Sequence, residues 1–130
     1  MSARSLQYYV IANRWALDLE FFKVETAFFY RLIEEYFIRS GDATYAAKFK
    51  KITEDLSKLE TDKSYAGRLL NNQLKQLELM AEDIIPEDID SLADKQIEIE
   101  YLVTGLLNEY REVKKELFSI VETIRKARDN

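Results

Sequence analysis

Residues that favour the end of a helix are scarce in this sequence. Proline occurs once, at Pro86, and glycine only at Gly41, Gly67 and Gly105, in a chain of 130 residues. Folds rich in sheets and loops need many turns, and turns depend on Gly and Pro. The scarcity therefore predicts a few long helices, with breaks at Gly41 and Pro86.

We expect three helices, over about residues 5–40, 43–85 and 91–128. Gly41 ends the first helix, because a left-handed residue after a helix costs least when it is glycine. Asp42 is a suitable N-cap for the second helix. Pro86 ends the second helix, because the residue before a proline avoids the helical conformation. Ser91 and Asp94 resemble a capping box at the start of the third helix.

Apolar residues in the second and third expected helices recur in alternating steps of three and four, the heptad spacing of helices that pack side by side. In the second helix these residues are Tyr45, Phe49, Ile52, Leu56, Leu59, Ala66, Leu70, Leu77 and Ile84. In the third helix they are Ile99, Leu102, Leu106, Tyr110, Val113, Leu117, Ile120, Ile124 and Ala127. Lys63 and Gln73 stand on the seam of the second helix and weaken it. Thr61, Ser64 and Gly67 leave open a break in that helix.

Long amphipathic helices joined by short connections pack as antiparallel neighbours. The sequence therefore predicts one all-α domain over residues 1–130, an antiparallel up-down-up bundle of three long helices with coiled-coil-like packing. The alternative is a four-helix bundle in which the second helix is broken near residues 61–64.

Two residue types that carry much of enzyme chemistry are missing from the chain. Without Cys there is no thiol nucleophile or disulfide, and without His there is no Ser-His-Asp triad and no imidazole metal ligand. No glycine-rich phosphate loop is present either. Glu98, Glu109 and Glu116 are carboxylates suited to a metal, but no metal-binding motif surrounds them. We therefore expect a protein that is not an enzyme and has no cofactor and no metal.

The charge and hydropathy of the chain bear on its partners. The net charge is −5, and an acidic surface disfavours nucleic acid. The longest apolar run near the N-terminus, over residues 8–12, is too short for a signal peptide or a membrane span. The polar face of the first helix mixes acidic with basic residues, unlike a membrane-surface helix. We expect a cytoplasmic protein that binds neither nucleic acid nor membranes.

The first expected helix is rich in aromatic residues, with ten of the sixteen in the chain lying in the first 37 positions. Placed at steps of roughly 100° per residue, its apolar residues form two stripes that together span about 240°. One stripe carries Leu6, Val10, Leu17, Phe21, Val24, Phe28 and Leu32. The other carries Tyr8, Ala12, Trp15, Leu19, Phe22, Tyr30, Ile33 and Phe37.

An apolar arc this wide exceeds what two partner helices need. Exposed apolar patches mark contact surfaces, and aromatic residues are enriched at interface cores. We interpret one stripe as core and the other as a contact surface for a second copy, giving a homodimer, or for another helical protein. The residues expected on that surface are Tyr8, Trp15, Leu19, Phe22, Tyr30, Ile33 and Phe37. The alternative is that the bundle covers the first helix on nearly all sides.

A thin polar line of Arg14, Asp18 and Glu25 lies between the two stripes. If the bundle buried both stripes, these charges would lie where charge is costly and would need partners or a ligand. The chain is therefore expected to be a non-enzymatic structural or protein-interaction module. The alternative is a small-ligand-binding or regulatory bundle with this line as its polar part. Its pocket would be lined by Trp15, Phe22, Phe29 and Tyr36.

Overall fold

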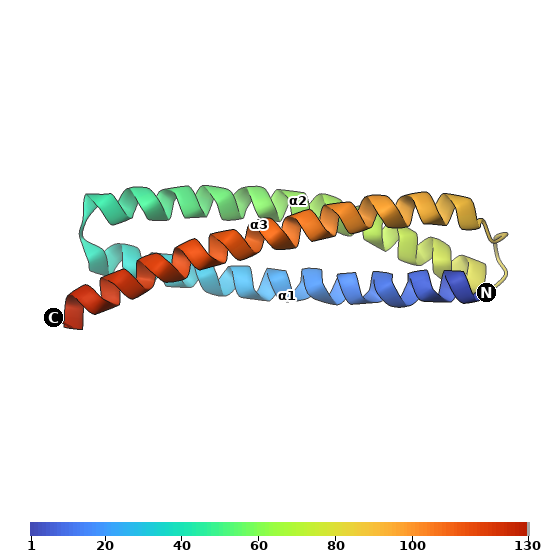
Figure 1. Ribbon diagram of the computed structural model, residues 1–130, viewed down its shortest axis with the longest axis horizontal. Coiled ribbons are helices and arrows are strands. Elements are labelled where there is room, and N and C mark those ends of the chain that lie inside the picture. The colour runs from blue at the N-terminus through green and yellow to red at the C-terminus, as the bar shows by residue number, and fades with distance from the viewer. Residues whose placement is uncertain (130) are drawn as a thin grey trace.

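The protein is a bundle of three long helices. The computed structural model describes residues 1–129, except the side chains of residues 39, 40 and 129, and the described residues contain no strand. The helices are α1 (Ala3–Ser40), α2 (Ala43–Ala81) and α3 (Ile89–Asp129). Figure 1 shows them side by side in an elongated bundle, each running opposite to the one before it. The all-α up-down-up bundle is confirmed, and the four-helix alternative is wrong because α2 is continuous.

The connection between α1 and α2 follows the expectation from the sequence. Gly41 adopts a left-handed conformation with φ of 60°, and the Asp42 carboxylate accepts a hydrogen bond of 2.8 Å from the Thr44 N–H. The start of α1 is two residues earlier than expected. It begins at Ala3 because the Ser2 hydroxyl accepts a hydrogen bond from the Ser5 N–H at 3.1 Å, as an N-cap does.

The second helix ends four residues before the expected boundary. It stops at Ala81, because Asp83 adopts a left-handed conformation with φ of 58°. The Ile84 N–H then donates to the Leu79 carbonyl at 2.9 Å, and the Asp83 N–H donates to the Met80 carbonyl at 3.2 Å. This pair of bonds closes a helix end without glycine. Ile84, expected on the α2 seam, is instead 62 % exposed.

The start of α3 is also corrected. The helix begins at Ile89, and its cap is Asp88, whose carboxylate accepts a hydrogen bond from the Ser91 N–H at 3.1 Å. The expected capping box of Ser91 with Asp94 is therefore not the start of the helix. A carboxylate at this position also favours the positive end of the helix dipole.

Most of the core is one apolar cluster that runs along the bundle between all three helices. The apolar residues of the α2 seam are buried from Phe49 to Leu77 as expected, while Tyr45 is half-buried. In α3 the buried positions continue the alternating steps of three and four. Two expected α3 positions differ: Leu102 is half-buried while its neighbour Val103 is buried, and Ala127 is exposed. Each fully buried Leu, Ile or Phe side chain contributes about 1.5–3 kcal/mol to folding, so this seam accounts for most of the stability of the bundle.

A second, smaller core cluster contains Leu77, Met80 and Leu92. Near it, Gln73 and Gln96 are both buried. The Gln73 amide donates to the Gln96 side-chain oxygen and to the Leu92 carbonyl, each at 3.1 Å. The Gln96 amide donates to the Tyr8 carbonyl of α1 at 3.2 Å. All three helices therefore take part in one buried polar contact, and each amide nitrogen that burial removes from water has a partner.

The connection between α2 and α3 is tied to the start of α1. The Glu87 carboxylate accepts hydrogen bonds from the Ser2 N–H at 3.0 Å, from the Ser2 hydroxyl at 2.7 Å and from the Ser5 hydroxyl. These bonds, that of the Ser5 hydroxyl first, lower the pKa of Glu87 to about 2. The carboxylate also lies at the N-terminus of α1, where negative charge is favourable.

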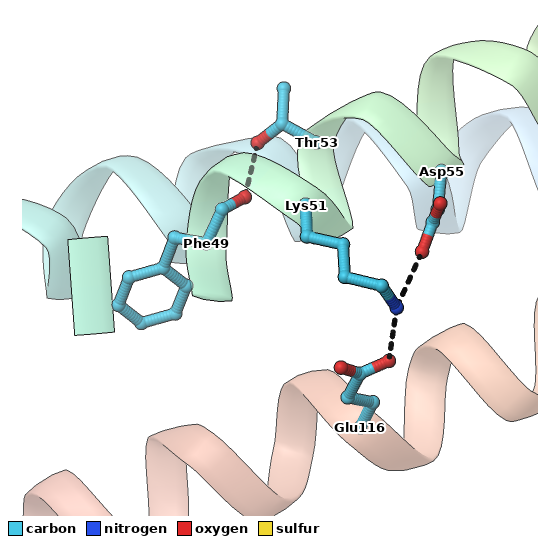
Figure 2. A network of polar contacts seen from close by, with 5 residues as sticks. All are labelled: Phe49, Lys51, Thr53, Asp55 and Glu116. Carbon is cyan, nitrogen blue, oxygen red and sulfur yellow. Dashed lines mark hydrogen bonds and ion pairs between the residues drawn. The ribbon is translucent and has the colours of Figure 1, made fainter. Parts of the chain in front are cut away.

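An ion pair also joins α2 to α3 on the surface. In Figure 2, the Lys51 ammonium lies between Asp55 of its own helix, at 3.5 Å, and Glu116 of α3, at 3.8 Å. The same view shows the Thr53 hydroxyl donating to the Phe49 carbonyl at 2.9 Å. Because the Lys51 side chain is 65 % exposed and those of Asp55 and Glu116 are 39 and 43 % exposed, each pair adds only about 0.2–1 kcal/mol.

Candidate functional site

Helix α1 carries apolar residues on two opposite faces. On the core-facing side, buried residues recur every seven positions from Ser5 to Ile33. A second row of buried residues lies three positions after members of the first. The buried members of both rows are Ser5, Ala12, Leu19, Phe22, Thr26, Phe29 and Ile33. Trp15, Tyr30 and Tyr36 are partly buried against the same core. These residues hold α1 against α2 and α3.

The opposite side of α1, which we name the outer face, is exposed. Its apolar members are between 51 and 71 % exposed: Leu6, Val10, Leu17, Phe21, Val24 and Phe28. From Val10 to Phe28 the outer face also advances in steps of four and three, with Arg14 taking one place in the row. Helix α1 thus has a second row with the heptad spacing that one helix uses to pack on another.

The contact surface expected from the sequence lies mainly on the core-facing side, so its assignment needs correction. Leu19, Phe22 and Ile33 are buried in the core, and Tyr8, Trp15 and Tyr30 are partly buried. Phe37 alone among the expected residues is half-exposed. Because apolar residues recur at the same spacing in both stripes, the sequence of α1 alone does not tell which stripe packs against α2 and α3. The exposed stripe is the one that begins at Leu6.

The expected polar line of Arg14, Asp18 and Glu25 does not form a single site. Arg14 is exposed and Asp18 is half-buried. Glu25 instead contacts α3, where the Lys114 ammonium lies 3.2 Å from each carboxylate oxygen and the Tyr110 hydroxyl donates to it. Burial, and then this hydrogen bond, raise the pKa of Tyr110. Glu25 is thus satisfied by a structural contact between α1 and α3.

A partly open cavity of about 230 Å³ lies between α1 and α2. From α1 it is lined by Phe22, Lys23, Thr26, Ala27 and Tyr30, and from α2 by Glu60, Lys63 and Ser64. Of the aromatic residues expected to line a pocket, only Phe22 contributes to this one. Phe29 is in the core, and Trp15 and Tyr36 pack against it.

Two polar groups at this cavity have contrasting environments. The Tyr30 hydroxyl donates to Glu60 at 2.5 Å, and burial, followed by this bond, raises the pKa of Tyr30. The Thr26 hydroxyl is buried and has no hydrogen-bond partner among the described residues. The hydroxyl lies near the Tyr110 hydroxyl of α3, and this contact opposes the rise of the Tyr110 pKa. The sequence signals for this site were Lys63 on the α2 seam and Thr26 on the core-facing row of α1, where the other members between Ala12 and Ile33 are apolar.

Within the described residues, no group of three or more acidic side chains is placed to hold a metal ion. None of the helices there has a stretch both apolar and long enough to cross a membrane. Comparison of the chain with known protein families, with curated proteins and with solved structures found no match. Two features of the described residues bear on function, the outer face of α1 and the cavity between α1 and α2.

Proposed function

We propose that the protein is a non-enzymatic interaction module that pairs with a second copy of itself through the outer face of α1. The observation that carries the proposal is the second apolar row on α1, which is exposed along Leu6–Phe28 and has heptad spacing. A helix that only covers a bundle carries polar residues on its outward side. An outward row of Leu, Val and Phe costs solubility unless another surface covers it.

The area of the outer face is suited to a small dimer interface. At about 150–250 Å² for a Phe side chain and somewhat less for Leu and Val, its six half-exposed side chains present on the order of 600 Å². Two copies would bury on the order of 1,200 Å², at the lower limit of stable interfaces. Interfaces of this size support affinities in the micromolar range when the contacts are well packed.

Charge does not select the orientation of the pair. Arg14 and Arg31 flank the apolar segment 17–28 of the outer face. Antiparallel overlap of this segment brings Arg14 of one copy towards Arg31 of the other, and a parallel pair brings each arginine towards its own counterpart. A two-fold pair closes on itself in either arrangement.

The test is the solution mass, measured by light scattering behind a sizing column over a concentration series. We expect a dimer for the native chain and a monomer for Phe21→Ser, which places a hydroxyl at the centre of the seam. Tyr101→Ser is the matched control, because Tyr101 is an aromatic residue on α3 that is 81 % exposed and lies outside α1. It should leave the mass unchanged. A native chain that stays monomeric at about 1 mM, where even weak specific pairs form, refutes the proposal.

A further inference from the structure

A groove of about 270 Å³ lies between α2 and α3. Its lining is Asp62 and Tyr65 from α2, with Tyr101, Leu102, Gly105, Leu106 and Glu109 from α3. Tyr101 is 81 % exposed and Tyr65 is 46 % exposed. Asp62, Gly105 and Glu109 are exposed as well. A molecule from solution can therefore touch both aromatic rings, both carboxylates and the backbone at the glycine.

Gly105 leaves a gap in one row of α3. Tyr101, Gly105 and Glu109 follow one another at intervals of four residues, so they lie on the same side of the helix. Glycine inside a helix is less favourable than alanine. Packing does not require it here, because a Cβ at Gly105 would meet nothing within 4 Å beyond the local helix backbone. The missing side chain thus opens the groove between an aromatic ring and a carboxylate.

The two ends of the groove differ in chemistry. Helices α2 and α3 run in opposite directions (Figure 1), so Asp62 lies on the side of Glu109, and Tyr65 on the side of Tyr101. Neither carboxylate has an ion pair or a hydrogen bond within the described part of the chain. Lys58 lines the next groove together with Glu109 but forms no ion pair with it there. The groove therefore has tyrosine rings towards one end and uncompensated negative charge towards the other.

This combination favours a weakly hydrated organic cation. Carboxylates attract positive charge, and the face of a tyrosine ring attracts a cation through its electron density. A strongly hydrated ion would have to give up water beside the rings and the half-buried Leu102. A quaternary ammonium group instead presents methyl groups to the rings. At about 30 Å³ for each water-sized group, the groove has room for roughly nine such groups, enough for choline.

We propose that the groove between α2 and α3 binds a small quaternary ammonium cation, with its methyl groups against Tyr65 and Tyr101 and its charge balanced by Asp62 and Glu109. A ligand that carries an anionic group beside the ammonium, as phosphocholine and the phosphatidylcholine headgroup do, is disfavoured by the two carboxylates. The ligand is therefore a free cation of the choline type. No residue of α1 lines the groove, so the site goes beyond the proposed pairing and does not depend on it.

A heteronuclear NMR titration with choline at low ionic strength is the direct test. The comparison probes are phosphocholine and dimethylbutanol, in which a carbon atom replaces the ammonium nitrogen of choline. We expect saturable shifts of the Gly105 amide and its neighbours, with a dissociation constant of about 5 mM or tighter. Both comparison probes should bind about fivefold more weakly or worse. No saturable shift up to about 50 mM choline, or dimethylbutanol or phosphocholine binding as tightly as choline, overturns the proposal.

Charge variants locate the site. Glu109→Gln should weaken choline binding by about threefold or more, because it removes one of the two charges that face the cation. Glu100→Gln is the matched control, since Glu100 is an exposed carboxylate of the same helix that does not line the groove. It should leave binding unchanged. If the two variants bind choline equally, the groove is not the site.

Two further variants test the gap and the ring. Gly105→Leu should fill the gap and weaken choline binding by about fivefold or more, while the melting temperature of the ligand-free protein rises, because leucine favours a helix more than glycine does. That opposite change excludes unfolding as the cause of the lost binding. Tyr101→Leu keeps an apolar side chain but removes the aromatic face, and it should also weaken binding. Native affinity in either variant contradicts the proposed contacts.

Discussion

Phe21 and Phe22 are adjacent phenylalanines whose replacement by alanine should have opposite consequences. Phe22 is 1 % exposed, and its ring packs edge-on against Tyr110 with centroids 4.5 Å apart. Phe21 is 63 % exposed on the outer face of α1. The two positions therefore separate what α1 does for folding from what it does for association.

The expected losses of unfolding free energy for the two variants differ by several kcal/mol. Removing a buried Phe costs about 3–5 kcal/mol of unfolding free energy through lost burial and the cavity left behind, and the aromatic contact of Phe22 with Tyr110 is included in that loss. Phe21→Ala should change the stability of the monomer by no more than about 0.5 kcal/mol. In the proposed dimer, however, its exposed area at about 25 cal/mol/Å² amounts to about 2 kcal/mol for each copy, so association should weaken by at least tenfold.

The assay is urea unfolding followed by far-UV circular dichroism, at a concentration low enough for the chain to be monomeric, together with the mass measurement at high concentration. Phe22→Ala should strongly lower the urea concentration at the unfolding midpoint. The slope of unfolding free energy against urea concentration should change little. Equal losses of stability for Phe21→Ala and Phe22→Ala in the dilute protein would refute the assignment of the two faces. If Phe21→Ala does not affect dimerisation, the assignment of the two faces of α1 stands, but the outer face is not the dimer contact.

Three further changes test the connections and the polar core. Gln73→Leu should cost about 1–3 kcal/mol in urea unfolding, because it leaves a buried acceptor on Gln96 unpaired, and replacing both glutamines by Leu should cost less than the sum of the single changes. Because the pKa of Glu87 is lowered to about 2, its contribution to stability is present above its ordinary value and is lost as the pH falls from about 4.5 towards 2. The melting temperature of Glu87→Gln should therefore depend less on pH in that window than that of the native chain, and an equal dependence would contradict the assigned hydrogen bonds. Asp83→Gly should raise the unfolding free energy by up to about 1 kcal/mol, since a non-glycine residue with a left-handed φ is strained, and a loss of stability would show that the Asp83 side chain is needed at that helix end.

The lengths and order of the helices were largely predictable from local sequence signals. Gly41 and Asp42 form the turn that their types favour. The continuous α2 followed from a seam that keeps its register across Lys63. The end of α2 was misplaced because Pro86 only forbids a helix from continuing, while the actual stop is the left-handed conformation of Asp83, a residue type that rarely ends helices in this way.

The candidate sites were predictable only in part. That α1 has two apolar stripes is visible in the sequence, but the inward stripe is selected by the shapes of α2 and α3, which the pattern of one helix does not contain. The contacts of Glu25 are with Lys114 and Tyr110, which are more than 80 residues away in the chain. The cavity between α1 and α2 is lined by residues of both helices, Thr26 and Lys63 among them, a combination that neither helix reveals alone.

The buried contact of Gln73 with Gln96 and the Tyr8 carbonyl has a consequence for how the helices align. A heptad seam of Leu, Ile and Phe nearly matches itself after a shift of seven residues, so apolar packing alone leaves neighbouring alignments close in energy. In a shifted bundle each glutamine amide would face apolar side chains and lose its partners. Substitutions among Leu, Ile and Val along the seams should therefore be tolerated while the alignment is kept, whereas the two glutamine positions decide which of the otherwise similar alignments the chain adopts.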